Sequence, residues 1–156
     1  MVEFRIRSME PADINAVMSI AANLDDAPHW PRQAYEAALD PRAAPRRITL
    51  VAEHIGTVVG FVIASLIPPQ AELETIAIAK SLARRKGGSA LLGALFRRLA
   101  SLKITEILLE VRASNFGAQA FYRAHGLVRY AGRKAYYPDT GEDAILMRGI
   151  ISVDDK

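Results

Sequence analysis

The chain has 156 residues, no cysteine, and a formal net charge of +3 from 20 basic and 17 acidic side chains. Hydrophobic residues make up 51% of it, which excludes a disordered chain. Its length suits one domain with a sizeable core, so we expect residues 1–156 to form a single domain. The lack of cysteine excludes disulfides, thiolate metal sites and any covalent intermediate on a cysteine.

Composition also limits the location and the partners. No apolar run approaches the ~20 residues of a membrane helix, and the N-terminal MVEFRIRSMEP has no apolar secretion core. We therefore expect a cytoplasmic protein with no membrane partner. No stripe of basic and aromatic residues stands out, so no nucleic-acid partner is expected. His29, His54 and His125 lack the spacing of metal ligands, and no metal site is predicted.

The first half of the chain predicts a strand, two helices and a hairpin. A strand around Phe4 and Ile6 leads to a helix opened by Pro11. The loop DDAPHWP at 25–31 then leads to a short helix over 34–39. Strands over 48–53 and 58–66 meet at a HIGT turn. Apolar residues repeat at helical spacing in the first helix at Ile14, Val17, Met18, Ala21 and Leu24.

The second half predicts a strand–helix–strand unit inside a mainly antiparallel sheet. A strand over 71–79 is followed by Gly87-Gly88 and a Leu-rich helix. The remaining elements are a strand over 104–111, a helix over 115–125 closed by Gly126, and strands over 127–137 and 144–150. This order predicts a mixed α/β fold.

A basic, glycine-containing turn, RRKGGS at 84–89, precedes the long helix. Glycines at a helix N-terminus let backbone N–H groups approach an anion, and neighbouring Arg and Lys side chains add contacts to phosphate. The turn matches neither a P-loop nor a dinucleotide-binding fingerprint. From these residues alone, a phosphate site and a plain solvated turn are equally good interpretations.

The segment ILLEVRASNFGAQAFY at 107–122 brings a carboxylate and a phenol onto neighbouring elements. Strand alternation separates Glu110 from its apolar neighbours, and in a central strand Glu110 must pair or line a cavity. The alternatives are a surface pair between Glu110 and Arg112, and a Tyr122 that only packs. Ser114 and Asn115 are both good helix N-caps.

The segment YYPDTGED at 136–143 combines two tyrosines with three acids. Such a loop could recognise a peptide or a cationic amine. By itself, an ordinary hairpin tip with flanking aromatics is the better interpretation.

Taken together, four segments resemble the GNAT superfamily of acetyl-CoA-dependent N-acetyltransferases, and within it the ribosomal-protein alanine N-acetyltransferase (RimI-like) family. The resemblance is close over the second half of the chain and looser in the first, where APHWP at 27–31 is similar to the family's substrate-side loop. The four segments are AELETIAIA at 71–79, RRKGGSALL at 84–92, LLEVRASNFGAQAFYRAHGL at 108–127 and YYPDTGEDAILM at 136–147.

The resemblance implies a GNAT fold, with a seven-stranded sheet that splays at its middle and acetyl-CoA in the splay. It implies that Glu110 is the general base and Tyr122 the general acid of a direct transfer in a ternary complex. The cofactor-binding residues it predicts are Ile76, Ala77, Ile78, Arg84, Arg85, Lys86, Gly87, Gly88, Ser89, Ala90, Asn115 and Tyr122.

The same resemblance implies an acceptor that is the N-terminal α-amine of a protein, such as a ribosomal protein. The alternatives are another amine, such as a lysine side chain, a polyamine or an aminoglycoside, and a catalytically silent CoA-binding module. The predicted substrate-binding residues are Trp30, Glu74, Tyr136, Tyr137 and Asp143.

The phosphate turn departs from the family pattern, which usually reads Gln/Arg-x-x-Gly-x-Gly/Ala. An ungapped alignment puts Ala83 at the first position and Lys86 in place of the first glycine. In the alternative alignment, Gly87 is that glycine and one residue is missing before Gly88. The lysine either adds a phosphate contact or weakens the backbone cradle.

Overall fold

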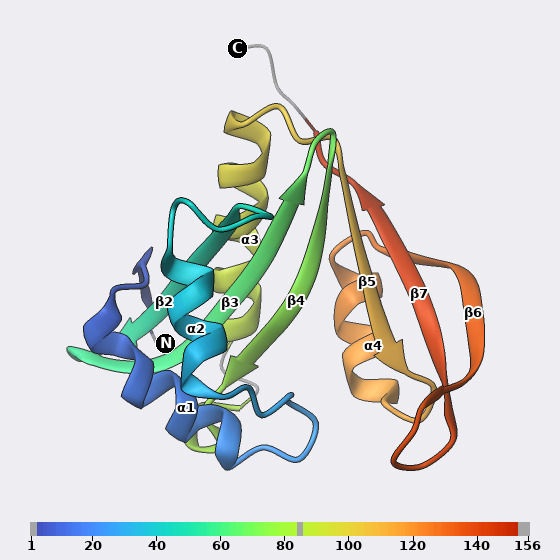
Figure 1. Cartoon of the computed structure of the whole chain (residues 1–156), viewed down its shortest axis with the longest axis horizontal. Helices are drawn as coiled ribbons and strands as arrows, with labels where there is room; N and C mark the ends of the chain where they lie inside the picture. The colour runs from blue at the N-terminus through green and yellow to red at the C-terminus, as the bar shows by residue number, and fades with distance from the viewer. Residues whose placement is uncertain (1–2, 84–85, 153–156) are drawn as a thin grey trace.

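The computed structural model describes residues 3–83 and 86–152. Seven strands form one sheet in the order β1-β2-β3-β4-β5-β7-β6, with four α-helices packed on it in the described part of the chain (Figure 1). This is the mixed, mainly antiparallel sheet that the sequence predicts. The strands are β1 (Arg5–Ser8), β2 (Arg47–His54), β3 (Thr57–Ile67), β4 (Gln70–Ile78), β5 (Glu106–Arg112), β6 (Val128–Tyr137) and β7 (Glu142–Ile150).

The helices cover the two faces of the sheet unequally. One core lies between the strands and the first two helices, and a larger core lies against the third. Figure 1 shows α1 and α2 on one face of β2–β4, and α4 against the opposite face of β5–β7. No helix in the described ranges is long and apolar enough to cross a membrane. The helices are α1 (Ile14–Ala22), α2 (Arg32–Leu39), α3 (Gly87–Ser101) and α4 (Phe116–Ala124).

The sheet splays between its two central strands. β4 and β5 are parallel, and they pair only from Gln70–Glu72 to Glu106–Leu108. A β-bulge leaves Glu74 without a partner on β3, because Thr75 pairs with Ile63 and Leu73 with Ala64. A bulge bends its strand, so we infer that it turns β4 away from β5 beyond this point. The splay that the resemblance implied is therefore present (Figure 1).

Local turn chemistry agrees with the sequence at most element ends. Ile55 and Gly56 both have positive φ, at 50° and 75°, and close the predicted β2–β3 hairpin. Gly126 follows α4 with a φ of 88°. The long helix is the exception: α3 begins at Gly87, so the two glycines form its first turn instead of preceding it.

Candidate active site

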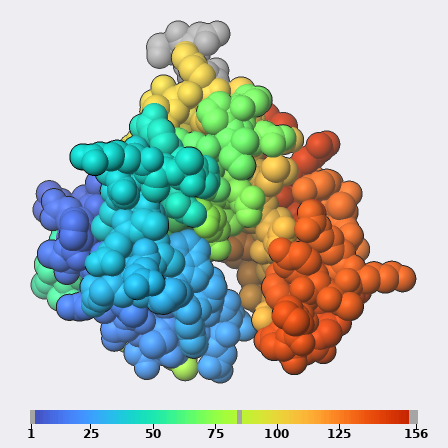
Figure 2. Space-filling view, viewed as in Figure 1, coloured from blue at the N-terminus to red at the C-terminus, as the bar shows by residue number. Residues whose placement is uncertain are grey.

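A cavity of about 1050 Å³ opens where β4 and β5 part. Its walls come from the α1–α2 loop, β4, the start of α3, the end of β5, α4 and the tyrosines at the end of β6. Figure 2 shows the hollow on the surface, between the blue α1–α2 region and the orange C-terminal strands. The cavity therefore gathers segments that are far apart in the sequence.

Most of the predicted site residues line this one cavity. Two of them, Ala90 and Asp143, are not among its lining residues, and Arg84 and Arg85 lie outside the described residues. The predicted residues that do line it are Trp30, Glu74, Ile76, Ala77, Ile78, Lys86, Gly87, Gly88, Ser89, Glu110, Asn115, Tyr122, Tyr136 and Tyr137.

The first turn of α3 forms one end of the cavity. The N–H of Ala90 donates to the carbonyl of Lys86 at 3.0 Å, which is the first bond of the helix. The preceding N–H groups, on residues 87–89, have no carbonyl one turn earlier in the helix to bind, and all three residues line the cavity. The positive end of the helix dipole adds to their attraction for an anion.

Lys86 preserves the backbone shape that glycine favours. Its φ is 68°, in the left-handed region, immediately before the helix. A lysine thus adopts the left-handed conformation at the position where the ungapped alignment expects glycine.

The two glycines serve close packing. A Cβ on Gly87 would lie 2.9 Å from the Ile78 side chain and 3.1 Å from Phe4, and one on Gly88 would lie 3.2 Å from Phe121. Glycine at both positions lets α3 approach β4 and α4 closely.

Glu110 enters the cavity from β5. Its neighbours Leu109 and Val111 are buried in the core, so strand alternation turns the half-buried Glu110 to the opposite, cavity side. The carboxylate faces the Tyr136 hydroxyl and raises its pKa above the usual value. It is not half of a surface pair with Arg112, because Arg112 binds Asp139 instead at 2.9 Å.

Tyr122 enters the same cavity from α4. Burial raises the pKa of its hydroxyl to about 12, so the phenol keeps its proton at neutral pH and can donate it. Its ring packs edge-on against Phe121 at 5.4 Å between centroids. The two residues are thus suited to opposite roles, with Glu110 as a proton acceptor and Tyr122 as a proton donor.

The link between β5 and α4 is held by two side chains. Asn115 caps α4, with its Oδ1 accepting the N–H of Ala118 at 3.1 Å, as the sequence predicts for Ser114 or Asn115. The buried Gln119, which the sequence did not single out, donates to the carbonyls of Arg112 and Ala113 at 3.1 and 3.0 Å. Together they fix the helix that carries Tyr122 against the strand that carries Glu110.

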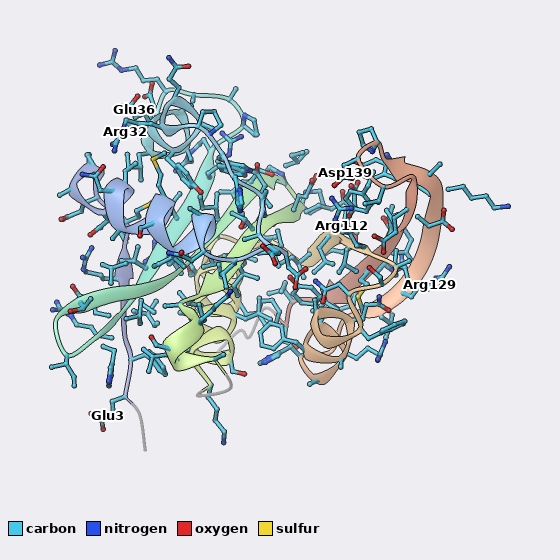
Figure 3. The ribbon with its side chains drawn as sticks, turned by 90° about the horizontal axis from the view of Figure 1, so that it is seen from below. Glu3, Arg32, Glu36, Arg112, Arg129 and Asp139 are labelled. Atoms are coloured by element: carbon cyan, nitrogen blue, oxygen red, sulfur yellow. The ribbon has the colours of Figure 1, made fainter. Side chains whose placement is uncertain are left out.

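The turn between β6 and β7 is tied to β5 by Arg112. The guanidinium pairs with Asp139 (Figure 3). It also lies 4.1 Å from the centre of the Tyr137 ring. Tyr136 stands edge-on to Tyr137 at 5.1 Å, and both line the cavity. Asp143 serves the hairpin, because its Oδ1 accepts the N–H of Ala135 at 2.9 Å.

Two further residues that the sequence predicts to bind the substrate, Trp30 and Glu74, also contact other side chains of the fold. Trp30 lies against Tyr35, with 5.3 Å between the ring centroids. Glu74 accepts the Nε–H of Arg47 at 2.7 Å. Both line the cavity, so neither contact removes them from reach of a ligand.

Two features of the site were missed at the level of sequence. Glu72 lines the cavity, and its only signal is its place in AELETIAIA, two residues before Glu74. The sequence indicates no role for His125, which lacks metal-ligand spacing, yet its Nε2 lies 2.9 Å from the Ser89 hydroxyl. No local pattern connects residues that are 36 positions apart.

A splayed sheet with a helix N-terminus, a carboxylate and a phenol around the splay defines a class of protein, the N-acyltransferases that take their acyl group from a CoA thioester. The model of the acetyltransferase (GNAT) family matches residues 16–127, and the chain belongs to that family. The predicted fold and family are confirmed.

Comparison with known proteins shows which members of the family this chain is similar to. The [ribosomal protein bS18]-alanine N-acetyltransferase of Escherichia coli is 31% identical over 150 residues, covering 95% of this chain and 98% of the relative. The crystal structure of the E. coli ribosomal-protein-S18-alanine N-acetyltransferase superimposes with a TM-score of 0.85 at 28% identity, over 99% of this chain and 97% of that one. An uncharacterized Mycobacterium leprae protein is 32% identical over 148 residues, and this chain spans 40% of its length.

Proposed function

We propose that the chain is an acetyl-CoA-dependent N-acetyltransferase that acts on the N-terminal α-amine of a protein, such as a ribosomal protein. The observation that carries the proposal is that Glu110 and Tyr122 line one cavity together with the first turn of α3. The proposed acceptor would be met in the cytoplasm, which is therefore the proposed location. We take residues 1–156 as one domain.

The residues at the α3 end of the cavity fit the phosphates of CoA. The outward N–H groups of residues 87–89 and the helix dipole favour an anion, and the Lys86 side chain can add a charge-assisted contact. Bound acetyl-CoA would supply an acetyl thioester as the acyl donor. The cavity volume of about 1050 Å³ lies just above the range of about 300–1,000 Å³ that is usual for ligand sites.

Side chains of the protein then carry out the proton transfers. An α-amine has a reference pKa of about 8 and is mostly protonated at neutral pH, so Glu110 accepts a proton from it, directly or through water. Beyond Glu72, β4 is not paired with β5, and its backbone N–H groups on that edge are available to the thioester carbonyl. We assign the contact with the thioester carbonyl to backbone N–H groups of residues 76–78. Tyr122 donates its proton to the departing thiolate.

The acceptor end supports a peptide. Trp30 on one side and the Tyr136–Tyr137 pair on the other give an apolar, aromatic border to the carboxylate of Glu110. The E. coli relative is a [ribosomal protein bS18]-alanine N-acetyltransferase, and this similarity favours a protein acceptor over a small amine.

The test is incubation with acetyl-CoA and a panel of acceptors, followed by thiol release and product mass. The panel contains peptides with free and blocked N-termini, a polyamine, an aminoglycoside and a peptide whose only amine is a lysine side chain. We expect transfer to free N-termini beginning with Ala and none to the blocked peptides. Transfer only to a small amine or to the lysine side chain would overturn the proposed acceptor. CoA binding without transfer to any member would overturn the proposed activity.

A further inference from the structure

Two consecutive tyrosines at the end of β6 lie on the same face of the sheet, which a regular strand does not allow. Successive side chains of a strand point to opposite faces, so Tyr136 and Tyr137 should diverge. Yet the Glu110 carboxylate faces the Tyr136 hydroxyl, and Arg112, on the same face of β5 as Glu110, lies over the Tyr137 ring. Both tyrosines line the cavity. The backbone that leads into them must therefore depart from strand geometry.

A bulge in β6 accounts for this departure. Ala135, inside the bulge, has a φ of 50°, a left-handed conformation that a residue with a Cβ disfavours. A bulge re-aims the side chains beside it, so it can bring Tyr136 to the face that Tyr137 occupies. Three residues of β6, 134–136, stand opposite one residue of β7, Asp143, between two regular pairs, Arg133–Ala144 and Tyr137–Glu142.

The Asp143 side chain holds this bulge. Its Oδ1 accepts the N–H of Ala135 at 2.9 Å, so a carboxylate oxygen replaces the backbone partner that the bulge removes. The Asp143 backbone is itself fixed, because its carbonyl accepts the N–H of Ala113 at 3.0 Å. Burial does little to orient Tyr136, which is 41% exposed on the outer strand of the sheet (Figure 1). A strained backbone persists only where its surroundings hold it, and here the surroundings include the Asp143 carboxylate.

We propose that Asp143 is a positioning residue for acceptor recognition. It holds the bulge that turns Tyr136 beside Tyr137 at the acceptor end of the cavity. It does not bind the acceptor directly, because it does not line the cavity. The inference rests on the proposed function, and it gives Asp143 a different role from the substrate contact that the sequence predicts.

The test measures KM for a peptide with a free N-terminal Ala and KM for acetyl-CoA. Asp143→Ala should raise the peptide KM about fivefold, as expected for one exposed hydrogen bond, and leave the acetyl-CoA KM unchanged. Asp143→Asn should stay within about twofold of wild type, because its amide oxygen can still accept the Ala135 N–H. Asp40→Ala is the matched control and should change neither constant, because the Asp40 Oδ1 also accepts a backbone N–H at 2.9 Å but Asp40 does not line the cavity.

Two results would overturn the positioning role. One is a wild-type peptide KM in Asp143→Ala. The other is an equal loss in Asp143→Asn and Asp143→Ala, which would indicate a direct contact through the charge. Urea unfolding shows whether Asp143→Ala folds. If it does not, Asp143→Asn decides: a peptide KM near wild type supports the positioning role, and a fivefold rise overturns it.

A second comparison tests whether Asp143 acts through Tyr136. In a Tyr136→Ala background, Asp143→Ala should raise the peptide KM no further, because the side chain that it positions is gone. A further rise as large as that in the wild-type background would overturn the proposal.

NMR separates this inference from the proposed function, because it needs no acceptor. The ring centroids of Tyr136 and Tyr137 are 5.1 Å apart. Contacts between the two rings should be present in wild type and Asp143→Asn and be lost in Asp143→Ala. That result in a protein that acetylates no peptide would overturn the proposed function and still support the hold of Asp143 on Tyr136. Ring contacts that persist in Asp143→Ala would overturn the positioning role whatever the turnover.

Discussion

The Ser89 hydroxyl lies 2.9 Å from Nε2 of His125, which connects the first turn of α3 to the end of α4. The His125 ring also packs on Phe121 at 4.8 Å between centroids, and Phe121 is the side chain against Gly88. α4 carries Tyr122. The proposed donor-binding turn and the proposed acid are therefore joined by direct contacts.

This link predicts coupling between the two residues. Ser89→Ala and His125→Ala should each raise KM for acetyl-CoA and lower kcat, and the double variant should be no worse than the poorer single one. A double-mutant cycle should give a coupling energy of about 1 kcal/mol. Ser101→Ala, at the other end of α3, is the control and should change neither constant. Additive effects of the two substitutions would contradict an energetic coupling between Ser89 and His125.

Lys86 is predicted to lower the free energy of unfolding and to strengthen the binding of acetyl-CoA. Lys86→Gly should raise the free energy of unfolding by about 1 kcal/mol, because glycine adopts the left-handed backbone without strain. It should also weaken acetyl-CoA binding, with a smaller loss at high salt. Lys103 has a φ of 63° at the far end of α3, so Lys103→Gly should give the stability gain alone. Equal acetyl-CoA affinities for Lys86→Gly and wild type would leave Lys86 as a solvent-facing side chain.

Arg112 is predicted to position the acceptor side of the cavity. Arg112→Gln removes the Asp139 pair and the contact with Tyr137, so steady-state kinetics should show KM for the peptide rising about fivefold with KM for acetyl-CoA unchanged. Arg148→Gln is the matched control, because Arg148 also pairs with an acid, Glu106, and lies over a tyrosine ring outside the cavity. A rise in the acetyl-CoA KM would point instead to a general disturbance of β5.

Much of this arrangement could be predicted from local sequence. Alternation along β5 separates Glu110 from the core, and Asn115 and Gly126 mark the ends of α4 by ordinary capping chemistry. These signals act within a few residues of the chain, where backbone geometry alone decides the outcome.

The missed features depend on packing between distant segments. The place of Glu72 in the cavity wall depends on the bulge at Glu74 and on the loss of β4–β5 pairing beyond Glu72, neither of which has a residue signature. Similarly, Lys86 adopts the left-handed conformation against its own propensity. His125 gains its partner only because two helix ends meet.

The burial of Tyr122 leads us to predict a loss of stability at high pH. Its pKa rises from 10.0 to about 12 on folding, so the unfolded chain releases the proton first as pH increases. The free energy of unfolding therefore keeps this contribution below pH 10. It falls by about 2 kcal/mol between pH 10 and about 12. Urea unfolding of Tyr122→Phe should lack this component, whereas Tyr130→Phe, at an exposed tyrosine, should retain it. Parallel curves for wild type and Tyr122→Phe would contradict the burial of this hydroxyl.

Acetyl transfer by Glu110→Gln tests the proposed chemistry most directly, measured beside wild type and Glu106→Gln on a peptide with a free N-terminal Ala. Glu106 lies on the same face of β5 but does not line the cavity. We predict that Glu110→Gln lowers kcat about 100-fold or more while its calorimetric affinity for acetyl-CoA stays at the wild-type value, and that Glu106→Gln turns over normally. Wild-type turnover in Glu110→Gln would contradict the assignment of Glu110 as the base.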